Sequence, residues 1–242
     1  MTVERIALIT GANKGMGFET ARQLGERGGV VLVGARDEGR GKRAADALVD
    51  RGITAVPLRL DVTDPASVAA AAAEVERSYG RLDVLVNNAG VAGGFTGAPS
   101  AATADDMREV YETNVFGVVT VTNAMLPLLR RSAAGRIVNM SSHLGSLTLN
   151  SDPGTPFARI NMIAYQSSKT ALNALTVAYA KELRGTTVKI NAAHPGIVAT
   201  DINGHQGRRT PAEGAVIAVR LATLDESGPS GACLSEDGTV PW

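Results

Sequence analysis

The sequence pattern places near one another a possible proton donor and two side chains that could assist it. Tyr165 and Lys169 lie four residues apart in segment 164–185, where the pattern predicts a helix, so both project from one face. Tyrosine is a poor acid or base at neutral pH because its unperturbed pKa is about 10, and a nearby ammonium favours the phenolate and moves that pKa toward neutral. Ser142 ends a predicted strand and can hold a carbonyl oxygen beside the phenol. Tyrosine and lysine at this spacing also occur as a plain surface pair, so the pair needs support from other positions.

A glycine-rich turn, TGANKGMG (10–17), follows the apolar run IALI and opens a predicted helix. Backbone amides at a helix N-terminus carry partial positive charge and free donors, so this turn is suited to a pyrophosphate group. Gly11 would allow the sharp turn, Gly15 the close approach of a phosphate, and Gly17 the close packing of helix on strand. The spacing G-x-x-x-G-x-G differs from the G-x-G-x-x-G pattern, and a turn that merely connects strand to helix is the alternative.

Short apolar runs alternate with longer helical stretches, which predicts βαβ units and a doubly wound parallel sheet with helices on both faces. The sequence contains no linker or repeat, so we expect residues 1–242 to form one α/β domain with seven strands. The predicted strands are 5–10, 30–35, 55–61, 82–88, 135–142, 188–196 and 231–238, and the predicted helices include 17–28, 39–52, 64–80, 104–132 and 164–185. The loops at 91–103, 145–163 and 200–211 are expected over the edge where the strands end, which is where such folds bind ligands.

Charge and composition exclude several classes of function. Lysine plus arginine and aspartate plus glutamate number 24 each, so no net field attracts nucleic acid or an anionic membrane. Aromatic residues make up only 4% of the chain and offer no stacking surface for single-stranded nucleic acid. The single Cys233 excludes an internal disulfide, and His143, His194 and His205 lack zinc-site spacing, so we expect no metal. The first ten residues hold only a strand-length apolar run without a cleavage pattern, so we expect a cytoplasmic protein without a membrane segment.

Four motifs combine into a specific pattern: TGxxxGxG at 10–17, NNAG at 87–90, Ser142, and the YxxxK of Tyr165 and Lys169. Together they resemble the short-chain dehydrogenase/reductase family over nearly the whole chain. The stretches VVLVGARDEGRG, LDVT and RLDVLVNNAGVA, the wide gap from Ser142 to Tyr165 and the C-terminal PW are similar to its carbonyl reductase branch. The resemblance implies a Rossmann fold and a nicotinamide cofactor.

The resemblance also implies a catalytic set of Asn114, Ser142, Tyr165 and Lys169. In this family the tyrosine protonates the carbonyl oxygen and the serine orients that oxygen. The lysine holds the nicotinamide ribose and lowers the tyrosine pKa, while the asparagine positions a water. Asn114 lies in YETNVFG. The alternative interpretation is that it is an asparagine inside a helix that makes only local hydrogen bonds. Ser141 competes with Ser142, and the spacing in SSHLG favours Ser142.

The same resemblance assigns the cofactor contacts along the chain. Asp61 and Val62 would meet the adenine, positions 88–90 the adenosine side, and the PGIVAT segment the nicotinamide end, while His194 receives no role. The full predicted cofactor set is Gly11, Asn13, Lys14, Gly15, Met16, Gly17, Arg36, Asp61, Val62, Asn88, Ala89, Gly90, Tyr165, Lys169, Pro195, Gly196, Ile197 and Thr200.

The end of the second strand distinguishes the two nicotinamide cofactors. An enzyme selecting NAD typically places a carboxylate there, which accepts hydrogen bonds from the adenosine ribose and repels a 2′-phosphate. That position is Ala35 here, followed by Arg36, and Lys14 in the glycine turn offers a second cation, so NADP(H) is the predicted cofactor. A one-residue shift of the strand end would instead direct Asp37 toward the ribose. Ordinary solvated surface charge is the alternative interpretation of both cations.

Two segments depart from the compact members of the family. Twenty-two residues separate Ser142 from Tyr165, so segment 146–164 is predicted to form a substrate wall and to reshape the usual dimer interface. The segment after Thr200 is short, which predicts an open pocket suited to bulky or varied carbonyl compounds.

We therefore predict an NADPH-dependent reductase that converts a ketone or aldehyde, a small-molecule substrate, to an alcohol. An NAD-linked alcohol dehydrogenase and a non-catalytic nucleotide-binding regulator are the alternatives. The intact set of four catalytic residues argues against the regulator, which would have no need of all four. A homodimer or homotetramer is expected, with a monomer left open.

Overall fold

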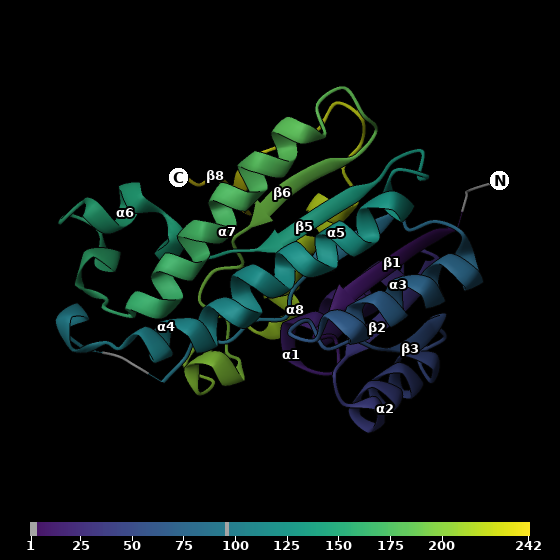
Figure 1. Cartoon of the computed structure of the whole chain (residues 1–242), viewed down its shortest axis with the longest axis horizontal. Helices are drawn as coiled ribbons and strands as arrows, with labels where there is room; N and C mark the ends of the chain where they lie inside the picture. The colour runs from purple at the N-terminus through teal and green to yellow at the C-terminus, as the bar shows by residue number, and fades with distance from the viewer. Residues whose placement is uncertain (1–3, 95–96) are drawn as a thin grey trace.

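The strands of the chain form one sheet with helices packed against it (Figure 1). The computed structural model describes residues 4–94 and 97–242, so the predictions for positions 1–3, and for 95–96 in the 91–103 loop, lie outside the described residues. The strands are β1 (Arg5–Thr10), β2 (Gly29–Ala35), β3 (Ala55–Arg59), β4 (Val84–Asn87), β5 (Arg136–Met140), β6 (Lys189–Ala193), β7 (Cys233–Ser235) and β8 (Gly238–Thr239). The helices are α1 (Gly15–Gly25), α2 (Glu38–Val49), α3 (Pro65–Tyr79), α4 (Ala104–Tyr111), α5 (Gly117–Leu129), α6 (Leu147–Ser151), α7 (Ile163–Glu182) and α8 (Pro211–Ala222).

The strand order is β3-β2-β1-β4-β5-β6-β7-β8, and every neighbouring pair is parallel except β7 with β8. β1 lies beside both β2 and β4, and Ala7 of β1 pairs with Val31 and with Val84. The chain therefore changes direction across the sheet between β1 and β4, which is the point where doubly wound sheets open a crevice for ligands. The predicted doubly wound parallel sheet is confirmed.

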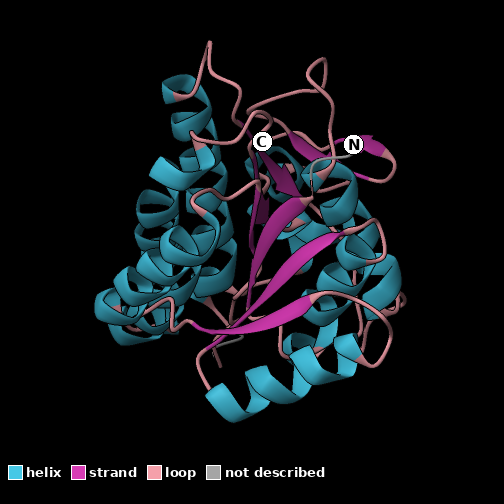
Figure 2. Ribbon diagram, turned by 90° about the vertical axis from the view of Figure 1, so that its right-hand side faces the viewer, coloured by secondary structure: helices cyan, strands magenta, loops and turns pink. Residues whose placement is uncertain are grey.

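Alternate residues of each strand supply two separate apolar cores. Ala7 and Ile9 of β1 pack on the side of α1, α2 and α8, whereas Ile6 and Leu8 pack on the side of α3, α5 and α7. Figure 2 shows the twisted sheet between these two layers of helices. Because both faces of the sheet are covered, the strands are apolar at nearly every position, and this burial explains the continuous apolar runs in the sequence.

The strand count of eight differs from the predicted seven because segment 231–238 begins a hairpin. Leu234 of β7 pairs with Thr239 of β8, and Gly238 has a φ of 127° where the chain reverses. A strand of two residues is too short to produce a periodic pattern, so the sequence gives no sign of β8.

The helices follow the predicted pattern with three differences. Predicted helix 104–132 divides into α4, a π-helical turn at Glu112–Phe116, and α5. The predicted loop 145–163 contains the short α6. α8 was not among the predicted helices, although Thr210 and Glu213 form a capping box and Pro211 occupies the first turn, which is a common signal for a helix start.

The carboxyl ends of the parallel strands face the loops that carry the predicted site residues. In Figure 1, α4 and α6 lie beyond the arrowheads of the central strands, on the side away from the N-terminus. Within the described residues, no helix is both long enough and apolar enough to span a membrane.

Candidate active site

The glycine turn after β1 has the geometry expected of a phosphate site. Gly11 and Gly15 have φ angles of 63° and 55°, in the left-handed region that favours glycine. A Cβ on Gly17 would lie 2.5 Å from Asn88 Nδ2, so only glycine lets α1 pack this closely. A Cβ on Gly15 would meet only Thr200 Cγ2, at 4.0 Å, so the first turn of α1 has room beside it. The free N–H groups of this turn could bind a phosphate in that space.

Thr10 connects the turn after β4 to the glycine turn through hydrogen bonds. Its hydroxyl accepts hydrogen bonds from the backbone N–H groups of Asn88 and Ala89, both at 2.9 Å, and the Asn88 side-chain amide donates to the Thr10 carbonyl at 2.8 Å. A Cβ on Gly90 would lie 3.6 Å from Lys169 Nζ, which places the NNAG turn next to that ammonium. Sequence reasoning gave Thr10 no role, although its place as the last residue of β1 in TGxxxGxG is a usable signal.

The end of β2 has the register that the sequence predicts. Ala35 is the last strand residue and is buried, and Arg36 and Asp37 follow as exposed residues. The Asp37 carboxylate accepts a hydrogen bond from the Arg40 N–H at 2.7 Å and caps α2. The Asp37 side chain is therefore engaged at the start of α2, and Arg36 is the first side chain beyond the strand.

The remaining residues of the predicted adenosine side lie around the same edge of the sheet. Asp61 follows β3, and its Oδ1 accepts hydrogen bonds from the N–H and hydroxyl of Thr63 at 3.0 and 2.8 Å. Val62 packs at the start of α5, where a Cβ on Gly117 would lie 3.0 Å from Val62 Cγ2. Asn13 and Met16 are half-buried in the glycine turn.

Tyr165 and Lys169 lie at the start of α7, with the spacing that places them on one face. Lys169 Nζ is 5.5 Å from the centroid of the Tyr165 ring and donates a hydrogen bond to the Met140 carbonyl at 2.8 Å. Ser142, two residues beyond Met140, lies close enough to Tyr165 for its hydroxyl to lower the pKa of the phenol. A hydroxyl from the end of β5 and two side chains from α7 thus come together, as the sequence predicts.

Burial sets the protonation of these groups. Desolvation raises the pKa of Tyr165, and the hydrogen bond with Ser142 lowers it by a smaller amount. Desolvation also lowers the pKa of Lys169 to about 8. The predicted decrease in the tyrosine pKa is therefore not the net effect in this structure, because desolvation of the phenol is the largest effect on its pKa. Tyr165 keeps its proton at neutral pH.

Asn114 lies in the π-helical turn and is buried. Its Oδ1 accepts a hydrogen bond from the Val91 N–H at 2.9 Å, and its Nδ2 donates to the Val91 carbonyl at 2.8 Å and to the Ser168 hydroxyl at 3.0 Å. Ser168 in turn donates to the Tyr165 carbonyl at 2.7 Å. Val91 and Ser168 are 23 and 54 positions away from Asn114, so the alternative of a locally bonded helix asparagine is wrong. Asn114 joins the β4 turn to the start of α7, and π-helical turns are frequent at functional sites.

The two adjacent serines have different partners. The Ser141 hydroxyl is buried and donates to Asn173 Oδ1 at 2.6 Å, whereas Ser142 contacts Tyr165. After Ser142, the His143 N–H donates to His194 Nδ1 at 2.9 Å, and burial lowers the pKa of His194 to about 3. The neutral His194 therefore holds the backbone next to Ser142.

The segment after β6 reaches across to the glycine turn. Gly196 has a φ of 82°, Pro195 is buried, and Ile197 is exposed. Thr200 approaches the glycine turn, and the carboxylate of Asp201 forms an ion pair with the ammonium of Lys14. The sequence predicts a phosphate as the partner of Lys14. The Lys14–Asp201 ion pair could not be predicted, because these two residues are 187 positions apart.

Segment 146–164 contacts His143 on one side and the C-terminal residue on the other. The Phe157 ring lies 4.9 Å from the His143 ring, between centroids, and the Asn150 side chain donates to the His143 carbonyl at 3.1 Å. On the other side, the Thr148 N–H and hydroxyl donate to the Trp242 carbonyl at 3.0 and 2.7 Å. The segment therefore packs directly beside Ser142, where the sequence predicts a substrate wall.

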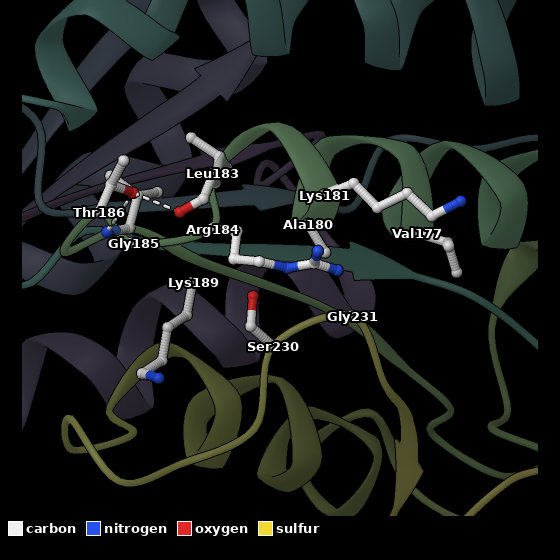
Figure 3. Close-up of a pocket in the computed structure, with 11 residues that line it drawn as sticks. Val177, Ala180, Lys181, Leu183, Arg184, Gly185, Thr186, Lys189, Ser230 and Gly231 are labelled. Atoms are coloured by element: carbon white, nitrogen blue, oxygen red, sulfur yellow. Dashed lines mark hydrogen bonds between the residues drawn. The ribbon is translucent and has the colours of Figure 1, made fainter.

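A surface pocket of about 340 Å³ lies away from these residues, at the C-terminal end of α7 (Figure 3). Lys181, Arg184 and Lys189 line it, and the Thr186 hydroxyl donates to the Leu183 carbonyl at 2.7 Å. Lys181 and Arg184 lie at the end of α7, where cations interact favourably with the negative end of the helix dipole. The pocket contains none of the predicted catalytic or cofactor residues. Within the part of the chain that the structure describes, no group of three or more histidine, cysteine or acidic residues could hold a metal ion.

Comparisons with known proteins agree with this geometry. The model of the short chain dehydrogenase family matches residues 5–210. A short-chain dehydrogenase of Penicillium roqueforti is 38% identical over 224 residues, which cover 90% of this chain and 88% of the relative. The NADPH carbonyl reductase 1 of Bos taurus is 33% identical over 98% of both chains. The crystal structure of NADPH-bound carbonyl reductase from chicken fatty liver matches with a TM-score of 0.86, at 31% identity and 100% coverage of both chains.

Proposed function

Because the chain belongs to the short-chain dehydrogenase family, we propose that it is an oxidoreductase that uses NADPH to reduce a ketone or aldehyde to an alcohol. The likeness to the carbonyl reductases of Bos taurus and chicken supports this reaction and this cofactor. The main observation in support of the proposal is that Ser142, Tyr165 and Lys169 lie near one another at the carboxyl edge of the sheet, next to the NNAG turn.

Tyr165 is the proton donor in this proposal. Burial keeps its phenol protonated at neutral pH, which is the state that carbonyl reduction requires. The Ser142 hydroxyl holds the substrate oxygen beside the phenol, so the proton crosses a short hydrogen bond. The Lys169 ammonium, 5.5 Å from the ring, stabilises the negative charge left on Tyr165. Asn114 is a positioning residue that fixes Val91 and Ser168 around the site.

The residues present fit a nicotinamide cofactor. The open first turn of α1 suits a pyrophosphate, because Gly15 leaves room beside the free N–H groups. When bound, the reduced cofactor supplies the hydride for the carbonyl carbon. We assign the adenosine side to Asp61, Val62 and the 88–90 turn, and the nicotinamide end to Lys169 and segment 195–200.

Arg36 is the main argument for NADPH over NADH. It is the first side chain after β2, it is exposed, and its planar guanidinium can bind a phosphate through two hydrogen bonds. The carboxylate of Asp37, which could have selected the ribose hydroxyl of NADH, is engaged in capping α2. Lys14 adds a second cation on the glycine turn.

A panel of aromatic and aliphatic ketones and aldehydes, incubated with the protein and NADPH, tests the proposal. We expect loss of the nicotinamide absorbance with several carbonyl compounds, and tighter binding of NADPH than of NADH in a competitive titration. Equal or tighter binding of NADH would favour the NAD-linked alcohol dehydrogenase. Tight NADPH binding, with no oxidation of NADPH by any carbonyl compound and no reduction of NADP⁺ by any alcohol, would favour the regulator.

The substrate side favours bulky, apolar compounds. Leu147 on α6 and Ile197 and Ile202 after β6 are exposed apolar side chains, at 65%, 55% and 46% exposure, on the two segments that border the site. We infer further that residues 1–242 form one domain. Cytoplasmic localisation and a homodimer or homotetramer stay predictions.

A further inference from the structure

Lys14 has two candidate partners for its ammonium. Its ammonium is proposed to hold the 2′-phosphate of NADPH, and in the structure it forms an ion pair with Asp201. The contact with Asp201 uses part of the hydrogen-bonding capacity and charge of this ammonium on the loop after β6.

The Asp201 carboxylate is held in place by its own loop. Its second oxygen, Oδ1, lies 2.9 Å from His205 Nε2. The loop is closed by hydrogen bonds from the Ala199 N–H to the Arg209 carbonyl at 2.8 Å and from the Asn203 side chain to the Val198 carbonyl at 2.9 Å. Asp201 therefore presents a fixed negative charge at the glycine turn.

A carboxylate that pairs with a phosphate-binding lysine acts on the cofactor through that lysine. It competes with the phosphate for the ammonium. NADH has no 2′-phosphate, so this competition does not affect it if Lys14 serves that group alone.

We propose that Asp201 is a specificity-determining residue that weakens NADPH binding by competing with the 2′-phosphate for Lys14. This inference rests on the proposed use of NADPH. Binding of the 2′-phosphate would break the Lys14–Asp201 pair, so Asp201 limits the preference for NADPH over NADH that Arg36 and Lys14 would otherwise provide.

Asp201→Asn is the direct test, because the amide keeps the size of the side chain and removes its charge. We expect the Kd for NADPH to fall about three- to tenfold and the Kd for NADH to stay within about twofold, a change in the range of a partly exposed charge contact. Glu182→Gln is the matched control, since Glu182 pairs with Arg130 at the opposite edge of the sheet with 50% and 52% exposure, close to the 62% and 53% of Lys14 and Asp201. This control should change neither Kd.

A double-variant cycle then assigns the effect to the pair. In a Lys14→Gln background, Asp201→Asn should lose most of its effect on NADPH binding. An unchanged Kd for NADPH in Asp201→Asn would overturn the inference, and so would equal gains for both cofactors, which would place Lys14 at the shared pyrophosphate. A wild-type protein that prefers NADH would instead refute the proposed function, so the two failures are distinguishable.

Discussion

Ser141 and Ser142 are neighbours in the chain, yet their hydroxyl groups contact different parts of the molecule. Ser141 donates to Asn173 inside the packing of β5 against α7, whereas Ser142 lies near the Tyr165 phenol and lowers its pKa. The same residue type therefore stabilises the fold at one position and meets the proposed proton donor at the next. This difference allows function and stability to be separated by a matched pair of variants.

We predict that Ser142→Ala lowers kcat/KM for carbonyl reduction by about 100-fold or more, because it removes a hydroxyl that holds the developing oxyanion. Its free energy of unfolding should change little, since Ser142 is only half-buried. Steady-state kinetics with NADPH and denaturant unfolding measure both quantities.

Ser141→Ala serves as the control and should behave in the opposite way. It leaves the buried Asn173 oxygen without its donor, which costs about 1 to 3 kcal/mol of stability. Its kcat/KM should stay within a few-fold of the wild type. A larger catalytic loss in Ser141→Ala than in Ser142→Ala would reverse the assignment.

Residue types and spacings allow the chemistry of the site to be predicted, but not every partner of each charge. The four-residue spacing of Tyr165 and Lys169 is a property of any helix, so their common face follows from the sequence. The hydrogen bond of Lys169 to the Met140 carbonyl and the ion pair of Lys14 with Asp201 join distant segments. Such partners depend on tertiary packing, which local patterns do not encode.

Among the helices, the π-helical turn at Glu112–Phe116 differs most clearly from what the local sequence pattern predicts. The sequence of 104–132 has the periodicity of one helix, and the turn interrupts it where Asn114 bonds to Val91 and Ser168. These long-range hydrogen bonds accompany the extra residue in the turn. The interruption brings the Asn114 side chain to the site, and no local signal in the sequence marks it.

Segment 146–164 is the element that should control substrate choice. Phe157 packs on the His143 ring, next to Ser142, and Met162 directly precedes α7, which carries Tyr165. We predict that Phe157→Ala and Met162→Ala change the ratio of kcat/KM between a bulky and a small carbonyl compound by about tenfold, the value of one or two contacts in an apolar pocket. The Kd for NADPH should stay within about twofold.

Val49→Ala is the matched control for this element. Val49 is an exposed apolar residue at the C-terminal end of α2, the end of the helix that lies away from Arg36. Its truncation should leave the ratio of kcat/KM between the bulky and the small carbonyl compound unchanged. An unchanged substrate ratio in a folded Phe157→Ala, Met162→Ala double variant would refute the substrate wall.

At the scale of the whole molecule, the sheet could be predicted because its strands are buried on both faces and therefore stand out as apolar runs. The two-residue β8 could not be predicted, since its pairing with β7 depends on a hairpin and not on periodicity. α8 was missed despite the capping signal of Thr210 and Glu213. The topology that did follow from the sequence is enough to bring the segments after β1, β2, β3, β4, β5 and β6 to one edge of the sheet.

The central claim is that this edge is a carbonyl-reducing site with Tyr165 as its proton donor. Tyr165→Phe removes one oxygen atom and keeps the ring that packs near Lys169, so the fold and the cofactor site should persist. The decisive measurement compares turnover of the wild type and this variant with NADPH and the best carbonyl substrate of the panel, alongside the Kd for NADPH. We predict a loss of turnover of about 100-fold or more with a nearly unchanged Kd. Turnover within a few-fold of the wild type, in a variant that binds NADPH normally, would contradict the account.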